Sequence, residues 1–131
     1  MFHIKYKLKP STIHGIGLFS EENVEKGRLI YSINKELDLV LTPEEYSKLT
    51  ANERTTIEHY GYFVENKWHL AFDDVRFCNH SDDGNIVKRG NTLIAKRSIK
   101  IGEELTQYYK EFDERTRIFI NNFQELNEII K

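Results

Sequence analysis

Two glycines separated by one residue follow a histidine near the start of the chain, in the segment His14–Phe19. Because glycine has no Cβ, such a segment lets the backbone approach a ligand closely while its amides donate hydrogen bonds. A plain turn or β-bulge is compatible with the same spacing. The segment does not match a dinucleotide-binding fingerprint, because neither a third glycine nor a helical pattern follows Gly17.

Short polar side chains gather in a second segment, Arg76–Asn85, directly after an apolar stretch. It contains Asn79, His80 and Ser81 in succession and ends in Asp-Asp-Gly-Asn, which also suits a turn bonded to its own side chains. A third segment, Gly102–Tyr109, ends on two adjacent tyrosines, which are ordinarily core residues. Each segment taken alone is therefore compatible with a structural role.

The elements that must position these segments are mainly short strands. Phe2–Leu8 alternates apolar and polar residues, which is the period of a half-buried strand, and Pro10 ends it. A further strand is expected after a turn at Gly102, and two hairpins are expected around Glu65–Lys67 and Arg89–Asn91. The remaining predicted strands cover residues 15–20, 28–33, 62–64, 68–72, 85–88 and 92–96.

Helix signals occur in the middle and at the end of the chain. Thr42, Pro43 and Glu45 form a capping-box pattern, and a second helix near Glu53–Tyr60 would end at Gly61. An amphipathic helix is expected over roughly 113–130, from an apolar stripe with helical spacing. The stripe comprises Phe112, Phe119, Phe123, Leu126 and Ile130. These patterns predict a β-rich α+β fold with short central helices and one closing helix.

Composition limits the classes of protein that fit. The 131 residues are 39% hydrophobic and 12% aromatic, which predicts one globular domain over residues 1–131. Nineteen Lys and Arg against 21 Asp and Glu argue against a non-specific nucleic-acid binder. No apolar run approaches the roughly 20 residues of a membrane span, and the alternating N-terminus shows no secretory signal. The single cysteine, Cys78, excludes an internal disulfide and a multi-cysteine zinc site.

In this order, the three segments resemble the SET-domain family of protein-lysine methyltransferases. The resemblance covers about Ser11–Tyr109, and residues 95–102 also resemble the family's approach to its last motif. It implies several small β-sheets, with the final segment passing through a loop as a pseudoknot, a core over about 11–109 and a C-terminal helix over 110–131. Such threading departs from the general rule against knotted connections.

The resemblance also implies a site for S-adenosylmethionine. The backbone around Gly15–Gly17 would hold the amino-acid end of the cofactor, and Asn79 and His80 would contact its amino-acid and adenine parts. The cofactor-binding residues implied are His14, Gly15, Ile16, Gly17, Arg76, Phe77, Asn79 and His80. Tyr109 is implied as the catalytic tyrosine, and Tyr60, Tyr62 and Gln107 as residues of the substrate-lysine channel, although a buried hairpin also accounts for the first two.

Methyl transfer from a sulfonium to an amine needs a neutral amine and tight alignment. A sulfonium about 4–5 Å from a lysine ammonium repels it by roughly 3–4 kcal/mol at an effective dielectric constant of 20. This repulsion lowers the pKa of the lysine by about 2–3, so no dedicated general base is required. The Tyr109 hydroxyl and backbone carbonyls can then orient the amine.

Three departures from the family pattern bear on these expectations. The segment Asn79–Asn85 lacks the frequent cysteine and proline, although Asn85 remains and Gly84 is competent for a turn. The cysteine-rich zinc modules are missing, as in the minimal viral and bacterial members. The C-terminal helix is therefore expected to cover the active site or bind a partner, with core packing or a dimer seam as the alternative. Gln107 replaces a frequent aromatic residue, which leaves the number of methyl groups added open.

Other functions remain open from the sequence. A protein that keeps this fold without catalysis would be a binding module. For an enzyme, a small amine is an alternative substrate to a lysine in a protein. A metal-binding β-domain would use His59, His69 and His80, whose spacing matches no compact ligand motif. The expected partner is a protein with a target lysine, a histone or another protein, with a homodimer as a further option. No nucleic acid, membrane or metal is expected, and the location would be cytoplasmic in a prokaryote, or nuclear or host-directed otherwise.

Overall fold

The computed structural model describes residues 1–111 and 113. The described residues divide into two compact units, the first comprising Met1–Asp38 and Ala71–Tyr108 and the second comprising Leu39–Leu70, Tyr109–Glu111 and Asp113. The helix predicted over 113–130 lies outside the described residues, apart from Asp113. The expectation of a single domain over residues 1–131 stays a prediction.

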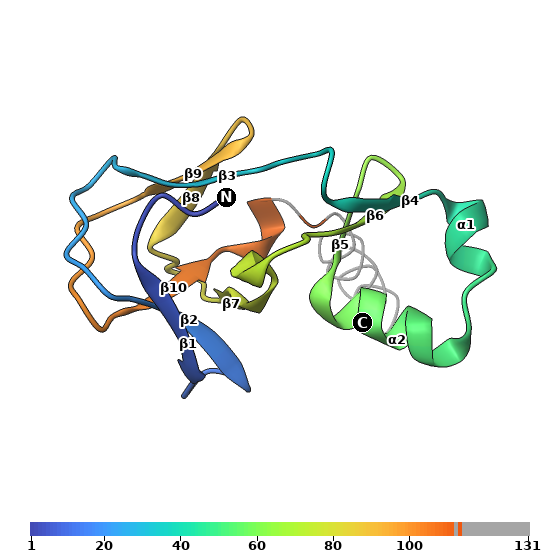
Figure 1. Ribbon diagram of the computed structural model, residues 1–131, viewed down its shortest axis with the longest axis horizontal. Coiled ribbons are helices and arrows are strands. Elements are labelled where there is room, and N and C mark those ends of the chain that lie inside the picture. Colours follow the sequence, from blue (N-terminus) through green and yellow to red (C-terminus); the bar gives the residue numbers. More distant parts are fainter. Residues whose placement is uncertain (112, 114–131) are drawn as a thin grey trace, which may run out of the picture. The chain divides into compact units, whose positions relative to one another are not determined.

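The first unit contains a seven-stranded sheet (Figure 1). Its strands are β1 (Tyr6–Pro10), β2 (Ile16–Ser20), β3 (Leu29–Ser32), β7 (Asn79–His80), β8 (Ile86–Arg89), β9 (Thr92–Ala95) and β10 (Glu104–Gln107). The order is β1-β2-β10-β8-β9-β3, with β7 also paired to β10. The predicted β8–β9 hairpin is present, and Gly90 in its turn has a φ of +61°, a conformation that favours glycine.

The N-terminal alternation predicted one strand where the structure has a short strand and an irregular lead-in. The strand β1 begins only at Tyr6, whereas Phe2 forms an isolated bridge with Tyr31. Ile4 is buried at 7% exposure, but Leu8 within β1 is 37% exposed. The alternation therefore identified Ile4 as a core residue, although it did not identify the extent of the strand.

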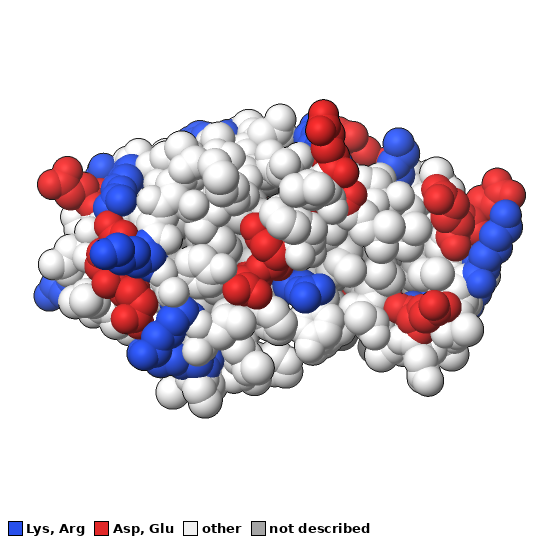
Figure 2. All heavy atoms as spheres, viewed as in Figure 1, with Lys and Arg blue, Asp and Glu red and all other residues white. Residues whose placement is uncertain are grey.

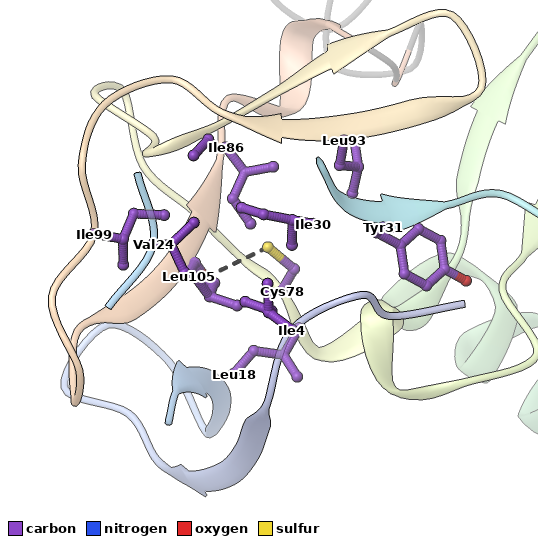
Figure 3. Packing of buried hydrophobic residues seen from close by; sticks show 11 residues of the cluster. Ile4, Leu18, Val24, Ile30, Tyr31, Cys78, Ile86, Leu93, Ile99 and Leu105 are labelled. Carbon is purple, nitrogen blue, oxygen red and sulfur yellow. Dashed lines mark hydrogen bonds between the residues drawn. The ribbon is translucent and has the colours of Figure 1, made fainter. Parts of the chain in front are cut away.

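The core of the first unit is formed by side chains from strands β2, β3, β8, β9 and β10 and from the connections of the sheet (Figure 3). The buried cluster comprises Ile4, Leu18, Val24, Ile30, Tyr31, Cys78, Ile86, Leu93, Ala95, Ile99 and Leu105. Cys78 lies inside it, and its Sγ donates to the carbonyl oxygen of Leu105 at 3.4 Å. Burial, with a smaller contribution from the nearby charge of Glu104, raises the pKa of the Cys78 thiol well above its usual value.

A short 3-10 helix, η1 (Asp74–Phe77), leads into β7 and is held by acidic residues at its start. Asp73 caps it, because its Oδ1 accepts from the backbone N–H of Val75. The hydroxyls of Tyr31 and Tyr6 donate to Asp73 and Asp74 at 2.8 and 2.9 Å. Burial, followed by the hydrogen bond to Asp74, raises the pKa of Tyr6 to about 12. These contacts set the position from which β7 begins.

Strand β10 is threaded through the sheet. Gln107 in β10 pairs in parallel with His80 of β7 and with Ile86 of β8. A residue in a strand pairs with two others only when they lie at its opposite edges. Because residues 81–85 join β7 to β8, this connection crosses β10. The crossing is the pseudoknot that the family resemblance implied.

Gly84 lies where this connection passes β10. A Cβ on Gly84 would lie 2.9 Å from the Cα and carbonyl carbon of Gln107 and from the carbonyl oxygen of Thr106. Gly84 has no positive φ. Glycine is therefore needed here because two backbones approach closely, and not because of a turn conformation. Arg97 holds the loop on its other side, by donating to the carbonyl oxygens of Asp83 and Gly84 at 3.0 and 3.4 Å.

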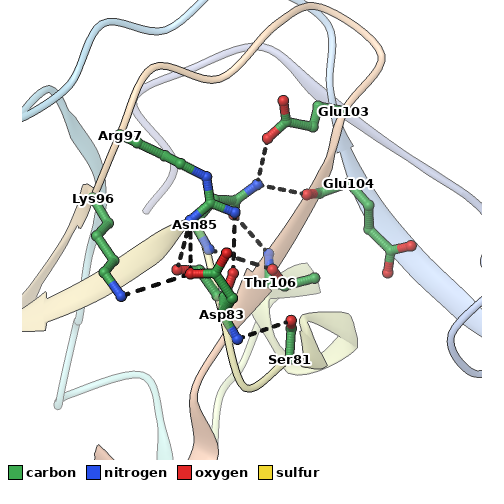
Figure 4. Close-up of polar contacts among 9 residues, drawn as sticks. Ser81, Asp83, Asn85, Lys96, Arg97, Glu103, Glu104 and Thr106 are labelled. Carbon is green, nitrogen blue, oxygen red and sulfur yellow. Dashed lines mark hydrogen bonds and ion pairs between the residues drawn. The ribbon is translucent and has the colours of Figure 1, made fainter.

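Asn85 fastens the crossing to β10 (Figure 4). Its Nδ2 donates at 2.8 Å to Oε2 of Glu103 and to the carbonyl oxygen of Glu104. Its Oδ1 accepts from the backbone N–H of Thr106 at 2.9 Å, and the residue is 2% exposed. The asparagine that remains from the family motif thus satisfies polar groups that the crossing would otherwise bury.

The second unit has a three-stranded antiparallel sheet of order β4-β6-β5. Its elements are β4 (Leu39–Leu41), α1 (Pro43–Ser47), α2 (Ala51–Tyr60), β5 (Tyr62–Val64), β6 (Lys67–Leu70) and the 3-10 helix η2 (Tyr109–Glu111). The β5–β6 hairpin is present as predicted, with a two-residue turn in which Glu65 and Asn66 have φ of +53° and +59°. Strand β4 was not predicted, because three residues are too short to show a period.

Both helices of the second unit begin with a capping box. Thr42 caps α1 with Glu45, and Thr50 caps α2 with Glu53, so α2 begins before the predicted Glu53. The backbone N–H of each threonine lowers the pKa of the glutamate that it bonds. Gly61 follows α2 with an extended φ of −95°. A Cβ there would meet two backbone oxygens at 2.6 Å, so Gly61 also serves close packing.

Candidate functional site

The segment from His14 to Gly17 needs its two glycines for different reasons. Gly15 has a φ of +45°, and open space surrounds the position that a Cβ would take. Gly17 has no positive φ, but a Cβ there would lie 2.5 Å from Oε2 of Glu104. The backbone is therefore shaped by the left-handed conformation of Gly15 and by a carboxylate packed against Gly17.

Asn79 in β7 joins this glycine segment to the threaded strand. Its Nδ2 donates to the carbonyl oxygens of His14 and Ile16 at 3.0 and 3.3 Å and to Oε2 of Glu104 at 2.9 Å. The residue is 8% exposed. Among residues 1–111 and 113, no donor bonds its Oδ1. The structure thus brings together residues of all three segments singled out in the sequence, and it leaves one acceptor of a nearly buried side chain without a donor from the described residues.

Ser11 and Glu104 belong to the same network, although the motifs assign them no individual role. The Ser11 hydroxyl donates to Oε1 and Oε2 of Glu104 at 2.8 and 3.0 Å and accepts from the backbone N–H of Ile13 at 2.9 Å. The backbone N–H of Ser11 donates to the carbonyl oxygen of Gly15 at 2.7 Å. A serine directly after a proline and before a glycine turn is a signal for such local bonding. No local signal predicts the contact with Glu104, which is 93 residues away.

His80 follows Asn79 in β7 and is partly exposed. Its Nε2 lies 3.0 Å from Oδ1 of Asp82, and its ring centroid lies 5.7 Å from that of Tyr108. Its backbone pairs with Gln107 of β10. The ring therefore lies between the loop of the crossing and the tyrosine that follows the threaded strand.

Arg76 and Phe77, both implied as pocket residues, lie in η1 before the Asn79 segment. Phe77 packs against the hydrophobic core, and the guanidinium of the exposed Arg76 lies 5.4 Å from the centre of its ring. This cation–π contact covers one face of Phe77. Both residues are placed by η1, to which they belong. Their role in binding a cofactor stays a prediction.

Gln107 ends β10 and is 6% exposed. Its carboxamide makes no hydrogen bond with the described part of the chain. A carboxamide has two N–H donors and an acceptor oxygen, so that of Gln107 is suited to bind a ligand group or water. This is the residue that replaces an aromatic residue of the family pattern.

Tyr109 lies in the second unit, at the start of η2. Its carbonyl oxygen accepts from the backbone N–H of Asp113 at 2.9 Å. Asp113 is 2% exposed, and its Oδ1 accepts from the backbone N–H of Phe63 in β5 at 3.3 Å. The backbone of Tyr109 is thus linked to the β5–β6 hairpin within its own unit.

The two tyrosines expected in a substrate channel, Tyr60 and Tyr62, also lie in the second unit. Tyr60 ends α2, is 37% exposed and has its ring centroid 4.5 Å from that of His59. Tyr62 stacks on His69 across the hairpin, with ring centroids 5.0 Å apart and planes 8° apart. The stack shows that Tyr62 contributes to the hairpin, one of the two roles left open for it.

Residues 1–111 and 113 contain no group of three or more His, Cys, Asp or Glu arranged to hold a metal ion. In the same residues, no helix has the length and apolar character needed to cross a membrane. On the face in Figure 2, acidic and basic side chains lie in mixed groups.

The threaded strand β10, beside an Asn-His strand that binds a glycine turn, defines this architecture as a SET-type fold. The model of the SET domain family matches residues 15–110. This chain therefore belongs to the SET domain family, as the resemblance of its three segments indicated. No curated protein sequence matches the chain.

Solved structures similar to this chain share its fold. A candidate histone methyltransferase of Plasmodium falciparum is 23% identical with a TM-score of 0.58, covering 82% of this chain and 94% of that chain. An active polycomb repressive complex 2 in the basal state is 24% identical with a TM-score of 0.62, covering 81% of this chain. A humanized mutant of the Chaetomium thermophilum complex is 24% identical with a TM-score of 0.62, covering 83%. This chain spans 15% of each of the two polycomb chains.

Proposed function

We propose that this chain is an S-adenosylmethionine-dependent methyltransferase that acts on the ε-amine of a lysine in a protein. Membership in the SET domain family supports the methyltransferase class. The observation that carries the proposal is the Asn79 carboxamide, which binds the glycine segment through Nδ2 and leaves Oδ1 without a donor among residues 1–111 and 113. A nearly buried acceptor beside a glycine backbone with open space at Gly15 suits a small ligand with a donor group.

The residues present fit the cofactor. The amino-acid end of S-adenosylmethionine carries an ammonium, which needs acceptors, and Oδ1 of Asn79 is one. The space around Gly15, where a side chain would otherwise stand, allows close approach to the backbone. When bound, the cofactor supplies the methyl group. The residues proposed to hold it are His14, Gly15, Ile16, Gly17, Arg76, Phe77, Asn79 and His80.

Tyr109 is proposed to orient the substrate amine through its hydroxyl. A phenol hydroxyl both donates and accepts, so it can bind an amine and align it for an in-line displacement. Tyr60 and Tyr62 are proposed to contribute aromatic walls to the lysine channel. The partner proposed is a protein that presents a lysine side chain, whether a histone or another protein.

Methylation is tested directly by incubating the purified chain with isotope-labelled S-adenosylmethionine and a cell lysate. Mass spectrometry of the digested proteins is expected to place the label on lysine side chains. Label recovered only on small amines would contradict a protein substrate. Cofactor binding without any labelled product would indicate a binding module.

Asn79→Ala is expected to weaken cofactor binding several-fold or more, because a polar group of the ligand loses its partner. The same substitution removes three contacts of Nδ2 and releases the glycine segment, so the melting temperature is also expected to fall. Titration calorimetry of the folded variant measures the affinity. Asn91→Ala, at an exposed turn position, is the matched control and should bind normally. Unchanged affinity in folded Asn79→Ala would remove this residue from the site.

Gln107→Ala tests how many methyl groups are added. The wild type is expected to form di- or trimethyl-lysine, because the carboxamide of Gln107 can turn away from the amine and leave space for further methyl groups. An aromatic ring at this position would keep its full size. The substitution should therefore change the product distribution little. Mass spectra of an exhaustively methylated peptide measure it. Only monomethyl-lysine with the wild type, and higher states with the variant, would show that the amide stops the reaction early.

A further inference from the structure

We infer that Glu104 is a positioning residue of the cofactor site, because its carboxylate sets the orientation of the Asn79 carboxamide and holds the glycine segment in shape. This inference rests on the proposed function for the identity of the ligand. The hydrogen bonds from which it is argued join residues of this chain to one another and do not involve the ligand. Glu104 opens β10, at the start of the strand that is threaded through the sheet.

The Glu104 carboxylate lies among groups that all belong to the site. Ser11 donates to both of its oxygens at 2.8 and 3.0 Å, and Nδ2 of Asn79 donates to Oε2 at 2.9 Å. The same Oε2 would lie 2.5 Å from a Cβ on Gly17. The carboxylate thus occupies the space that a side chain at Gly17 would need, and it binds the glycine segment through two different residues.

The chemistry of these groups decides which end of the Asn79 carboxamide faces inward. An ionised carboxylate only accepts hydrogen bonds, and so do the carbonyl oxygens of His14 and Ile16. With three acceptors on one side, Nδ2 faces them and Oδ1 faces away. The bond to Glu104 is charge-assisted, so it is roughly twice as strong as a bond to a neutral acceptor. Glu104 is therefore the side chain that presents Oδ1 of Asn79 as an acceptor for the ligand.

Two substitutions at this position separate the acceptor from the rest of the side chain. Glu104→Gln keeps an acceptor oxygen for Asn79, and its new amide can donate to the Ser11 hydroxyl, which also accepts. The dissociation constant of the Glu104→Gln variant for S-adenosylmethionine is expected to stay within about threefold of that of the wild type. Glu104→Ala removes the acceptor, and the dissociation constant is expected to rise about tenfold or more. If Glu104→Ala does not fold, Glu104→Met fills a similar volume without an acceptor and takes its place.

Glu103→Ala is the matched control. It also removes a glutamate that accepts from an asparagine amide, since Oε2 of Glu103 lies 2.8 Å from Nδ2 of Asn85. That contact fastens the crossing and does not involve the glycine segment. Glu103→Ala is expected to lower the melting temperature and to leave cofactor affinity within about twofold of the wild type in the folded protein.

A second measurement needs no cofactor. In nitrogen-15 NMR spectra of the protein alone, the side-chain amide signals of Asn79 are expected to shift in Glu104→Ala and to stay close to the wild type in Glu103→Ala. Wild-type protein that fails to bind S-adenosylmethionine would contradict the proposed function, while these spectra still test the orientation of Asn79. The inference on Glu104 is overturned by wild-type affinity and amide signals in Glu104→Ala. Equal losses of affinity in Glu103→Ala and Glu104→Ala, or no rescue by Glu104→Gln, would also overturn it.

Discussion

Tyr109→Phe is expected to lower kcat for lysine methylation at least tenfold, with little change in cofactor affinity. The substitution removes only a hydroxyl, and a hydroxyl that acts mainly in the transition state lowers kcat without a matching rise in KM. The backbone contact of Tyr109 with Asp113 is independent of the side chain, so η2 should be preserved. Steady-state kinetics with a methyl-accepting peptide, together with calorimetry for the cofactor, measures both quantities.

Tyr108→Phe is the matched control for this experiment. It precedes Tyr109 in the chain, lies in the first unit and has its ring near that of His80. It should retain most of the activity if the catalytic hydroxyl is that of Tyr109. Full turnover by Tyr109→Phe together with a large loss in Tyr108→Phe would move the catalytic role to Tyr108.

Gly84→Val is expected to prevent the chain from reaching its native fold. Even the Cβ of alanine would lie 2.9 Å from three backbone atoms of Thr106 and Gln107, and a branched side chain requires more room. Overpacking ordinarily costs about 1–3 kcal/mol, but here the obstacle is backbone that the pseudoknot holds in place. Gly84→Ala should therefore be strongly destabilised and Gly84→Val unfolded. Circular dichroism and urea titration measure these effects.

Gly90→Asn is the control glycine substitution. Gly90 has a positive φ, and no atom lies within 4 Å of an added Cβ, so a residue that tolerates this conformation should fold normally. The Cys78 thiol gives a second readout, because its burial in the core and its raised pKa protect it from thiol reagents in the native protein. Rapid labelling is expected in Gly84→Val and slow labelling in the wild type. A folded and protected Gly84→Val would show that the crossing tolerates a side chain.

Much of the local structure of this protein follows from its sequence. The threonine and glutamate pairs at the start of each helix, and the glycine in the β8–β9 turn, specify these elements through contacts three residues apart or less. The order of the glycine, Asn-His and Gly-Glu-Glu-Leu segments indicates the family, and a family model over residues 15–110 agrees. Local patterns carry this information because turns and caps are formed by neighbours in the chain.

The tertiary structure alone decides what these segments do together. The role of Gly84 depends on the backbone of Gln107, and that of Gly17 depends on the carboxylate of Glu104. Neither partner is visible in the sequence, where Gly17 indicates a close approach to a ligand or a turn and Gly84 indicates a turn. The Ser11 contact with Glu104 joins residues 93 positions apart, and no periodicity encodes such a pairing. The chemistry of each residue is thus set by its type. Its partners are set by the tertiary structure, in which the connection between β7 and β8 crosses β10 and packs residues that are distant in sequence closely together.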